Sequence, residues 1–402
     1  MLMKAVLPLF VFVDACGWEI IKNDPFASDL APKRKKLDSV FGYSSACVPS
    51  ILSGGWPDEH RNWCYFVYDP KNSPFKSLRW LRWLPNKITS RRIFRRWLSK
   101  FVKVQLSFRG YFDLYNIPFK HIAEYDFTEK KSPLQPEGMN VGPNIFDFLE
   151  YRKISYHVSA PQKTEQQNLN ALISDIRREN IDFAFLYWPA LDGLLHSVGN
   201  QSPLVPQKLR DYEKWIRELV AVAEKHYAEV RLYIFSDHGM ANCDVLLDLK
   251  AKIEPLPLRM GKDYSVVYDS TMARFWFFNE RARQEITAAL KTVSQGRILP
   301  EAELKKLRAP TDGYFGELIF LADEGVLIVP SHMGERPIRG MHGYHPSAKQ
   351  SYAMLCTNQS DIPEETVAIP DIFRLMTRDA ELAAAKNSTA PRKDYEQPSF
   401  VG

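Results

Sequence analysis

The stretch LYIFSDHGM at residues 232–240 joins a short apolar run directly to a serine, an aspartate and a histidine. A continuous apolar run of this length is typical of a strand buried on both faces, as in a parallel sheet. Gly239 permits the backbone to leave the pleat, so that Asp237 and His238 can both turn toward one point. The stretch therefore predicts a buried strand that ends at a chemical site.

Two further apolar runs end in the same way. Residues 7–13 stop at Asp14, and residues 183–188 are followed closely by Asp192. In open parallel sheets, ligands bind beyond the carboxyl ends of the strands. We therefore expect the acidic residues after these three strands to converge on one edge of a sheet.

Helical patterns separate the second and third runs and precede the second. Residues 164–180 have apolar residues at helical spacing behind Thr164, a plausible N-cap, and residues 204–229 have a similar pattern. Alternating helices and strands predict a parallel sheet with crossover helices. The expected fold class is α/β, with a mostly parallel central sheet and helices on both faces.

Composition and length agree with a large globular chain. The 402 residues are 45% apolar and 25% charged, which excludes wholesale disorder, collagen-like repeats and coiled coils. The five cysteines form no C-x-x-C pair, which fits reduced thiols and excludes a zinc ribbon. The apolar run at residues 7–13 is too short for a signal peptide or a membrane span. We expect a cytoplasmic protein.

The sequence divides into a core and added segments. Residues 1–60 and 164–380 are expected to form the catalytic core, with a peripheral insertion at about 245–336. Residues 61–163 lack the strand and helix rhythm and are rich in Trp, Phe, Arg and Pro, which predicts an inserted cap. Residues 381–402 are expected to form a frayed tail.

The cap contains the strongest charge asymmetry in the chain. Residues 71–109 hold twelve basic residues and no acidic one, whereas the net charge of the whole chain is only +5. Three tryptophans lie among these charges, at Trp80, Trp83 and Trp97. The segment fits either a lid over the core or a contact with an anionic membrane surface, which would make the protein peripheral to a membrane. Nucleic acid is disfavoured, because no nucleic-acid fold motif accompanies the patch.

Further residues suited to chemistry follow the strands. Asp192 and His196 are four residues apart, which on a helix places both side chains on one face, as for two ligands of one divalent metal. The stretch GMHGYHP at residues 340–346 places His342 between two glycines. Taken singly, such features also fit a helix cap, a structural histidine or a surface turn. Together with Asp14, Asp237 and His238, they indicate a metal site.

The stretch SSACVPSILSGGWPDEH at residues 44–60 completes the set. With it, the chain resembles the alkaline phosphatase superfamily, most closely its type I phosphodiesterase/nucleotide pyrophosphatase branch. Members of that branch have a Thr or Ser nucleophile ten residues before the glycine of a Thr-Gly or Ser-Gly pair, and counting back from Gly54 gives Ser44. The motifs D-x-x-x-H-x-x-G, S-D-H-G-M and G-x-H-G-Y follow in order at residues 192–199, 236–240 and 340–344.

The resemblance implies an alkaline-phosphatase-like sandwich with two divalent metal ions, usually zinc. One ion would be held by Asp192, His196 and His342. The other would be held by Asp14, Asp237, His238 and the Ser44 oxygen. Carboxylates combined with imidazoles suit zinc or manganese better than magnesium.

Two features near Ser44 depart from the family pattern or leave it ambiguous, and one alternative branch is disfavoured. The branch commonly has an asparagine three residues after the nucleophile, where this chain has Cys47. Ser45 lies directly beside Ser44, and only the motif spacing favours Ser44. A sulfatase is disfavoured, because the C-x-P-x-R motif would need an arginine where Ile51 stands.

These patterns predict a metal-dependent phosphodiesterase or nucleotide pyrophosphatase that acts through a phospho-serine intermediate. The alternative is a phosphomonoesterase or a phosphoryl-group transferase with the same site. The substrate is expected to be a small molecule or a lipid-linked or glycan-linked phosphate. A non-catalytic binding protein is disfavoured, because the nucleophile and every metal-ligand position are filled.

Overall fold

The computed structural model describes residues 3–83 and 91–387, and within them a six-stranded sheet forms the centre of the molecule. The strands lie in the order β2 (Lys33–Leu37), β16 (Ala353–Thr357), β7 (Tyr227–Phe235), β1 (Lys4–Val13), β6 (Phe183–Trp188) and β5 (Tyr156–Val158). β1 pairs in parallel with β6 and β7, and β5 with β6, whereas β16 is antiparallel to both of its neighbours. The prediction of a mostly parallel α/β sheet is confirmed.

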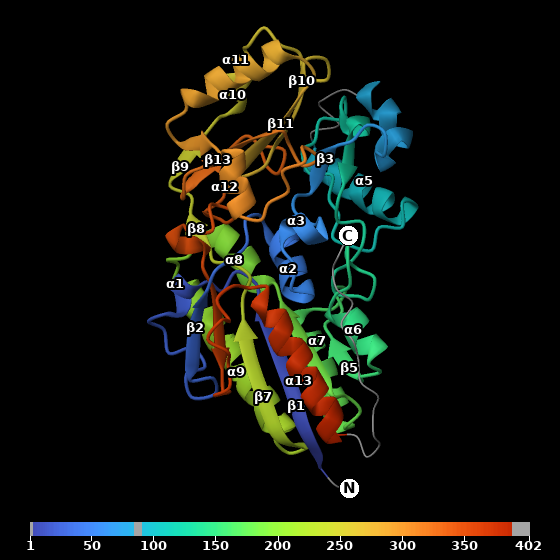
Figure 1. Cartoon of the computed structure of the whole chain (residues 1–402), viewed down its shortest axis with the longest axis vertical. Coiled ribbons are helices and arrows are strands. Elements are labelled where there is room, and N and C mark those ends of the chain that lie inside the picture. The colour runs from blue at the N-terminus through green and yellow to red at the C-terminus, as the bar shows by residue number, and fades with distance from the viewer. Residues whose placement is uncertain (1–2, 84–90, 388–402) are drawn as a thin grey trace.

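Helices cover both faces of this sheet, as predicted (Figure 1). On one face, Phe10 and Phe12 of β1 share a hydrophobic core with α2 (Ser44–Ser53), α6 (Ile145–Tyr151) and α13 (Asp371–Asn387). On the other face, Leu9 and Val11 pack with α7 (Glu165–Arg177) and α9 (Leu204–Ala223). The alternation along β1 thus supplies both cores, because successive side chains of a strand point to opposite faces.

The predicted helices are present, with one shifted boundary. The Thr164 hydroxyl accepts a hydrogen bond from the Gln167 amide at 3.2 Å, so Thr164 is the N-cap of α7 as predicted. α9 ends at Ala223, six residues before the predicted end at residue 229. The reason is that β7 begins at Tyr227, which is opposite Lys4 in the parallel pairing with β1.

The cap is smaller than predicted. The elements of the cap are β3 (Phe66–Tyr68), η1 (Pro74–Trp83), α5 (Arg92–Gln105), η2 (Ile122–Glu124) and β4 (Tyr125–Phe127). The short helix α3 (Pro57–His60) precedes the cap and is bonded to α2, since His60 Nε2 lies 2.9 Å from the Ser50 hydroxyl oxygen. Residues 145–163 were predicted to belong to it, but β5 is a strand of the central sheet and Phe146 of α6 packs against Phe185 of β6. The cap therefore ends before α6. Lys87, one of the twelve basic residues, lies outside the described residues.

The insertion at 245–336 has a sheet and a hydrophobic core of its own. Its antiparallel strands are β10 (Tyr264–Tyr268), β11 (Met272–Phe277), β13 (Leu318–Ala322) and β12 (Gly296–Ile298), with β9 (Val245–Leu247) paired to β14 (Val326–Ile328). Its helices are α10 (Lys250–Ile253), α11 (Glu280–Lys291) and α12 (Glu301–Lys306). The insertion lies beyond one end of the central sheet, at the top of Figure 1.

The C-terminal helix continues further than predicted. α13 extends to Asn387, so residues 381–387 are helical rather than frayed. Asn387 explains the extension, because its side-chain oxygen accepts from the Ala5 and Val6 amides and its amide donates to the Val6 carbonyl. The rest of the predicted tail, residues 388–402, lies outside the described residues.

No helix in the described part of the chain has the length and apolar character that crossing a membrane requires.

Candidate active site

Two groups of candidate metal-ligating side chains are formed by the residues that the sequence predicted. The helix α8 (Ala190–Val198), which carries Asp192 and His196, lies near the middle of the long axis in Figure 1. One group consists of Asp192, His196 and His342, and the other of Asp14, Asp237 and His238. Within each group the candidate ligand atoms lie within 4.8 Å of one another. The groups adjoin, because the His238 ring stacks on the His342 ring. All six residues predicted as metal ligands, Ser44 aside, are brought together.

The first group is built on α8 (Ala190–Val198), whose helical repeat places Asp192 and His196 one turn apart on one face. The Asp192 Oδ1 atom lies 3.3 Å from His196 Nε2 and 3.7 Å from His342 Nε2. His196 Nδ1 donates to the Gly340 carbonyl at 2.8 Å, which orients the ring and leaves its Nε2 facing the carboxylate. Gly340 belongs to β15 (Gly340–Met341), so this bond also ties α8 to the segment that carries His342.

The second group lies at the ends of the neighbouring strands β1 and β7. Asp237 Oδ1 accepts hydrogen bonds from the amides of Ala15 and His238, at 3.1 and 3.0 Å. These bonds leave Asp237 Oδ2 beside His238 Nε2, at 3.1 Å, and Asp14 Oδ1 lies 3.8 Å from the same nitrogen. His238 Nδ1 donates to the Gly239 carbonyl at 2.9 Å, so its Nε2 faces the carboxylates.

Gly239 serves this site in a different way from the one predicted. Its φ is not in the left-handed region, but a Cβ there would lie 2.2 Å from the Gln350 carbonyl oxygen, and a Cβ on Gly17 would lie 2.3 Å from the Gly239 Cα. Glycine is therefore needed because other backbone segments approach closely. This approach packs the turn after β7 against the turn after β1 and so joins the two halves of the second group.

Three buried carboxylate oxygens have no hydrogen-bond partner among the described residues: Asp14 Oδ1, Asp192 Oδ1 and Asp237 Oδ2. A buried polar atom without a partner costs about 1–3 kcal/mol, and more when it is charged. These atoms are the ones that face the histidines within the two groups. A divalent cation in each group would satisfy them, so the donor set fits two metal ions.

The carboxylates have perturbed and opposed pKa values. Burial raises the pKa of Asp14 well above its ordinary value, and the neighbouring charges of Asp237 and Asp192 raise it further. Burial also acts to raise the pKa of Asp192, but His196 and the other histidines outweigh it and hold that pKa well below its ordinary value. Opposed shifts in one cluster are typical of functional sites.

The pKa values of two of the histidines also shift in opposite directions. Burial acts to lower the pKa of His238, but Asp237 and Asp14 outweigh it and raise the pKa to about 10. Burial and the adjacent His238 lower the pKa of His342 well below its ordinary value. The protein without metal therefore holds the His238 ring charged and the His342 ring neutral, although the two rings are stacked.

Ser44 is the first residue of α2, and its hydroxyl oxygen lies 3.0 Å from His238 Nε2, beside the second ligand group. Ser45 is turned away, because its hydroxyl is buried and donates to the Trp63 carbonyl at 3.0 Å. The geometry therefore favours Ser44, as the motif spacing did. Because α2 begins at Ser44, the positive end of its helix dipole also lies beside this hydroxyl and suits an anion.

Cys47 does not replace the family's asparagine as a polar contact on the open side of the site. Its side chain is fully buried, and its sulfur lies 3.5 Å from the Ser39 hydroxyl oxygen. Burial raises the pKa of the thiol, so it stays protonated. The Cys47 side chain is therefore not available to bind a phosphate oxygen near Ser44.

Two supporting residues were missed by the sequence analysis. Tyr187 of β6 donates from its hydroxyl to Asp14 Oδ2 and so fixes the orientation of that carboxylate. Thr271 comes from the insertion, between β10 and β11, and its hydroxyl donates to the Gly343 carbonyl at 2.9 Å. The same hydroxyl oxygen is 2.8 Å from the Tyr43 hydroxyl, which also accepts from the Thr271 amide at 3.1 Å. Neither residue lies in a motif, so no sequence signal marks them.

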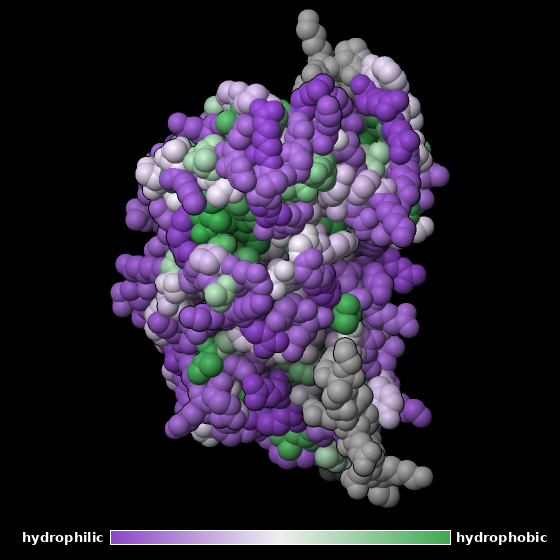
Figure 2. All heavy atoms as spheres, turned by 45° about the horizontal axis from the view of Figure 1, so that its top comes forward, coloured by the Kyte–Doolittle hydropathy of each residue, from purple (hydrophilic) through white to green (hydrophobic). Residues whose placement is uncertain are grey.

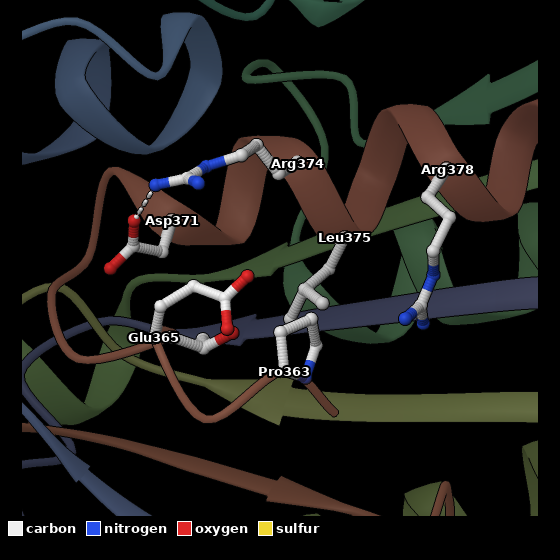
Figure 3. A pocket seen from close by; sticks show the side chains of 7 residues that line it. Pro363, Glu365, Asp371, Arg374, Leu375 and Arg378 are labelled. Atoms are coloured by element: carbon white, nitrogen blue, oxygen red, sulfur yellow. Dashed lines mark hydrogen bonds and ion pairs between the residues drawn. The ribbon is translucent and has the colours of Figure 1, made fainter. Parts of the chain in front are cut away.

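A cavity of about 220 Å³ lies elsewhere, beside the start of α13 (Figure 3). Arg374 and Arg378 of the helix and Pro363 and Glu365 of the preceding loop line it. In Figure 3 the Arg374 side chain turns toward Asp371, with which it forms an ion pair. None of the lining residues belongs to either ligand group, so this cavity is separate from the candidate site.

Comparison with known proteins agrees with the geometry. The family model for type I phosphodiesterase / nucleotide pyrophosphatase matches residues 9–345. The human ectonucleotide pyrophosphatase/phosphodiesterase family member 5 is 26% identical over 211 residues, which cover 50% of this chain and 42% of that protein. The chain thus aligns with less than half the length of this curated relative.

Solved structures show the same fold. The structure of human ectonucleotide pyrophosphatase / phosphodiesterase 5 superposes with a TM-score of 0.66 and 15% identity, over 98% of this chain and 97% of that one. Phosphonoacetate hydrolase from Sinorhizobium meliloti 1021, in complex with phosphonoacetate, gives a TM-score of 0.61 and 13% identity, over 94% of this chain and 96% of that one. At these identities the likeness establishes the alkaline-phosphatase-like fold.

Proposed function

The chain belongs to the type I phosphodiesterase / nucleotide pyrophosphatase family, whose members are hydrolases of phosphoric ester or anhydride bonds, and we propose that it cleaves a phosphodiester or phosphoanhydride at a two-metal site. One observation carries the proposal. Ser44 lies 3.0 Å from His238, within a cluster whose three carboxylates each have a buried oxygen without a hydrogen-bond partner in the described chain. A nucleophile beside two sets of carboxylates and imidazoles that can hold metal ions is what metal-assisted displacement at phosphorus requires.

Each of the two ligand groups would hold one metal ion. Asp192, His196 and His342 would hold one ion. Asp14, Asp237 and His238, with the Ser44 oxygen, would hold the other. Two such ions, zinc or manganese, supply charge stabilisation for the attacking and leaving oxygens and lower the pKa of the serine hydroxyl.

The residues of the chain position the reaction. The Ser44 hydroxyl gives up its proton to solvent and its oxygen attacks phosphorus, so an Oγ–P bond forms. The bond from phosphorus to the leaving oxygen breaks, and that oxygen takes up a proton from solvent. The N-terminal end of the α2 dipole would favour the negative charge of a phosphate oxygen beside Ser44. Water then attacks the phospho-serine and releases the phosphoryl product and the Ser44 hydroxyl. The Tyr187 and Gly340 hydrogen bonds hold Asp14 and His196 in place throughout.

The composition of the site favours a diester over a monoester. A phosphomonoester dianion brings one more negative charge than a diester. The main charges that shift the pKa values of Asp14, Asp192, His196, His238 and His342 come from carboxylates and histidines, and none comes from an arginine or a lysine of the described chain. We therefore assign the diester or anhydride activity ahead of the phosphomonoesterase alternative.

A leaving-group comparison tests the proposal. Protein loaded with zinc, and separately with manganese, is assayed with bis(p-nitrophenyl) phosphate, a nucleoside diphosphate sugar and p-nitrophenyl phosphate. The first two substrates should be cleaved with the higher kcat/KM. A higher kcat/KM for p-nitrophenyl phosphate would assign the site to a phosphomonoesterase, and turnover equal to that of Asp192→Asn with all three would refute the catalytic assignment.

A further inference from the structure

The cap helix α5 is held to the protein by one face. Leu98 and Val102 of this face are buried in the main hydrophobic core. The Arg95 guanidinium is also buried and donates to the Ile117 carbonyl at 3.0 Å, and it lies over the Phe119 ring at 4.3 Å. The helix is therefore anchored, and its remaining surface has a fixed orientation.

A second face of α5 is apolar and exposed. The exposed fractions are 85% for Ile93, 66% for Trp97, 51% for Phe101 and 80% for Val104. At 3.6 residues per turn, these four residues fall within about 80° of arc, so they form one stripe. The Trp97 and Phe101 rings are stacked, with centroids 6.1 Å apart. Packing against the core does not explain why this stripe is apolar, because α5 faces the core with its other side, which carries Leu98 and Val102.

A third face of α5 is basic and adjoins the stripe. It consists of Arg92, Arg96, Lys100 and Lys103, and the helix has no acidic residue. The neighbouring η1 repeats the combination, since Trp80 and Trp83 are 57% and 76% exposed beside the exposed Arg79 and Arg82. Hydrophilic residues cover most of the face shown in Figure 2. On α5 and η1, in contrast, exposed apolar side chains gather beside basic ones.

We propose that the outer surface of α5 and η1 docks the protein on a membrane that contains anionic lipid. Indole and phenyl rings partition into the headgroup boundary, while arginine and lysine on the adjacent face contact the lipid phosphates. An anionic bilayer can bind both faces of the helix at once. Its acyl chains accept the apolar stripe, and its negatively charged headgroups attract the basic face. This docking does not depend on the proposed hydrolase activity. If both hold, a phosphate carried on a lipid is the natural substrate.

Vesicle co-sedimentation of the full chain tests the proposal. One set of vesicles contains phosphatidylcholine alone, and the other contains phosphatidylcholine with about 30% phosphatidylserine. At low ionic strength the protein should sediment with the anionic vesicles at least tenfold more strongly than with the neutral ones, and 0.5 M salt should release most of it. Lipid with brominated acyl chains should quench wild-type tryptophan fluorescence more than that of Trp97→Phe.

Two sets of exposed substitutions separate the basic face from the apolar stripe. Arg92→Glu/Arg96→Glu/Lys100→Glu removes the charge, and its matched control is Lys252→Glu/Lys262→Glu/Lys291→Glu, on the exposed surface of the insertion. Trp97→Ser/Phe101→Ser removes the stripe, and its matched control is Val245→Ser/Leu246→Ser, at exposed apolar residues of β9. Both test variants should lose at least tenfold in vesicle binding, and both controls should bind as wild type does.

Specific outcomes would overturn the docking. They are absence of wild-type binding at low salt, equal binding by the test and control variants, or no difference in bromine quenching between wild type and Trp97→Phe. In each case the segment would be a lid or would contact another macromolecule. Hydrolysis of soluble bis(p-nitrophenyl) phosphate by the α5 variants should match wild type, so a failure of docking is distinguishable from a failure of the proposed catalysis.

Discussion

The imidazole rings of His238 and His342 lie face to face, with their centroids 3.8 Å apart and their planes inclined by 12°. Each ring belongs to a different ligand group, so the two predicted cation positions are neighbours rather than independent sites. One phosphoryl group can therefore contact both positions. The stacking also means that the two rings cannot both carry a proton without strong repulsion, which agrees with their opposite pKa shifts.

The first prediction concerns the two adjacent serines. Ser44→Ala should lower kcat on the order of 10³-fold or more, because it removes the nucleophile, while metal content stays near that of wild type. Ser45→Ala is the matched control: it loses only the hydrogen bond to the Trp63 carbonyl and should keep most of the activity. Steady-state kinetics with metal analysis checks both. Loss of activity in Ser45→Ala alone would reassign the nucleophile.

The second prediction concerns metal stoichiometry. Titration calorimetry of wild type with Zn²⁺ should give two ions per chain, and chelation should lower Tm, because the unpartnered carboxylates then repel one another. Asp192→Asn should bind one ion, since it disrupts a single group. Asp211→Asn, at an exposed helical position, is the control and should bind two. A single ion in wild type would contradict the two-site assignment.

The third prediction concerns Thr271. Thr271→Val removes the hydroxyl that donates to the Gly343 carbonyl, so the backbone beside His342 should lose its fixed position. We expect kcat to fall about tenfold or more, because small displacements of catalytic groups have large effects. Thr287→Val, on α11, is the control and should be close to wild type. Unchanged kcat in Thr271→Val would show that Tyr43 and Gly343 hold their places without it.

The fourth prediction concerns His60 and acid stability. Its ring is buried, its Nε2 donates to the Ser50 hydroxyl oxygen at 2.9 Å, and its Nδ1 accepts from the Asn62 amide at 3.1 Å. Burial lowers its pKa to about 3, so the folded protein keeps the ring neutral while the unfolded chain binds a proton below about pH 6.5. Stability is therefore lost as pH falls from about 6.5 toward 3.

The loss attributable to His60 should reach about 2 kcal/mol between pH 7.5 and pH 5. Urea unfolding of wild type and His60→Gln at both pH values measures it. The variant should show a correspondingly smaller decrease in the free energy of unfolding over that interval, whatever its stability at pH 7.5. Equal decreases in the two proteins would show that His60 does not contribute.

Local patterns were enough to predict the parallel core and the ligand positions. Buried strands in a parallel sheet have continuous apolar sequences, and the chemistry follows them within a few residues, as Asp14 and Asp237 do. β2, in contrast, has the sequence KRKKL and was not predicted. It lies at the sheet edge, where lysines protect an exposed strand from unwanted pairing. Its sequence therefore lacks the continuous apolar run from which the buried strands were predicted.

The remaining features depend on contacts distant in sequence. Whether residues 145–163 join the cap or the core is decided by the pairing of β5 with β6, which local composition does not encode. Thr271 reaches the site only because the insertion folds back over the segments that carry Tyr43 and Gly343. A helix signal such as the Thr164 cap is local and was read correctly.

The Thr271 contacts also bear on how this protein can be modified or can diverge. The insertion cannot be removed without disturbing the site, because its turn at Thr271 forms hydrogen bonds with Tyr43 and with Gly343. Tyr43 precedes Ser44, and Gly343 follows His342. A chimaera that exchanges residues 245–336 with those of a relative should work only if it restores a hydroxyl at this turn.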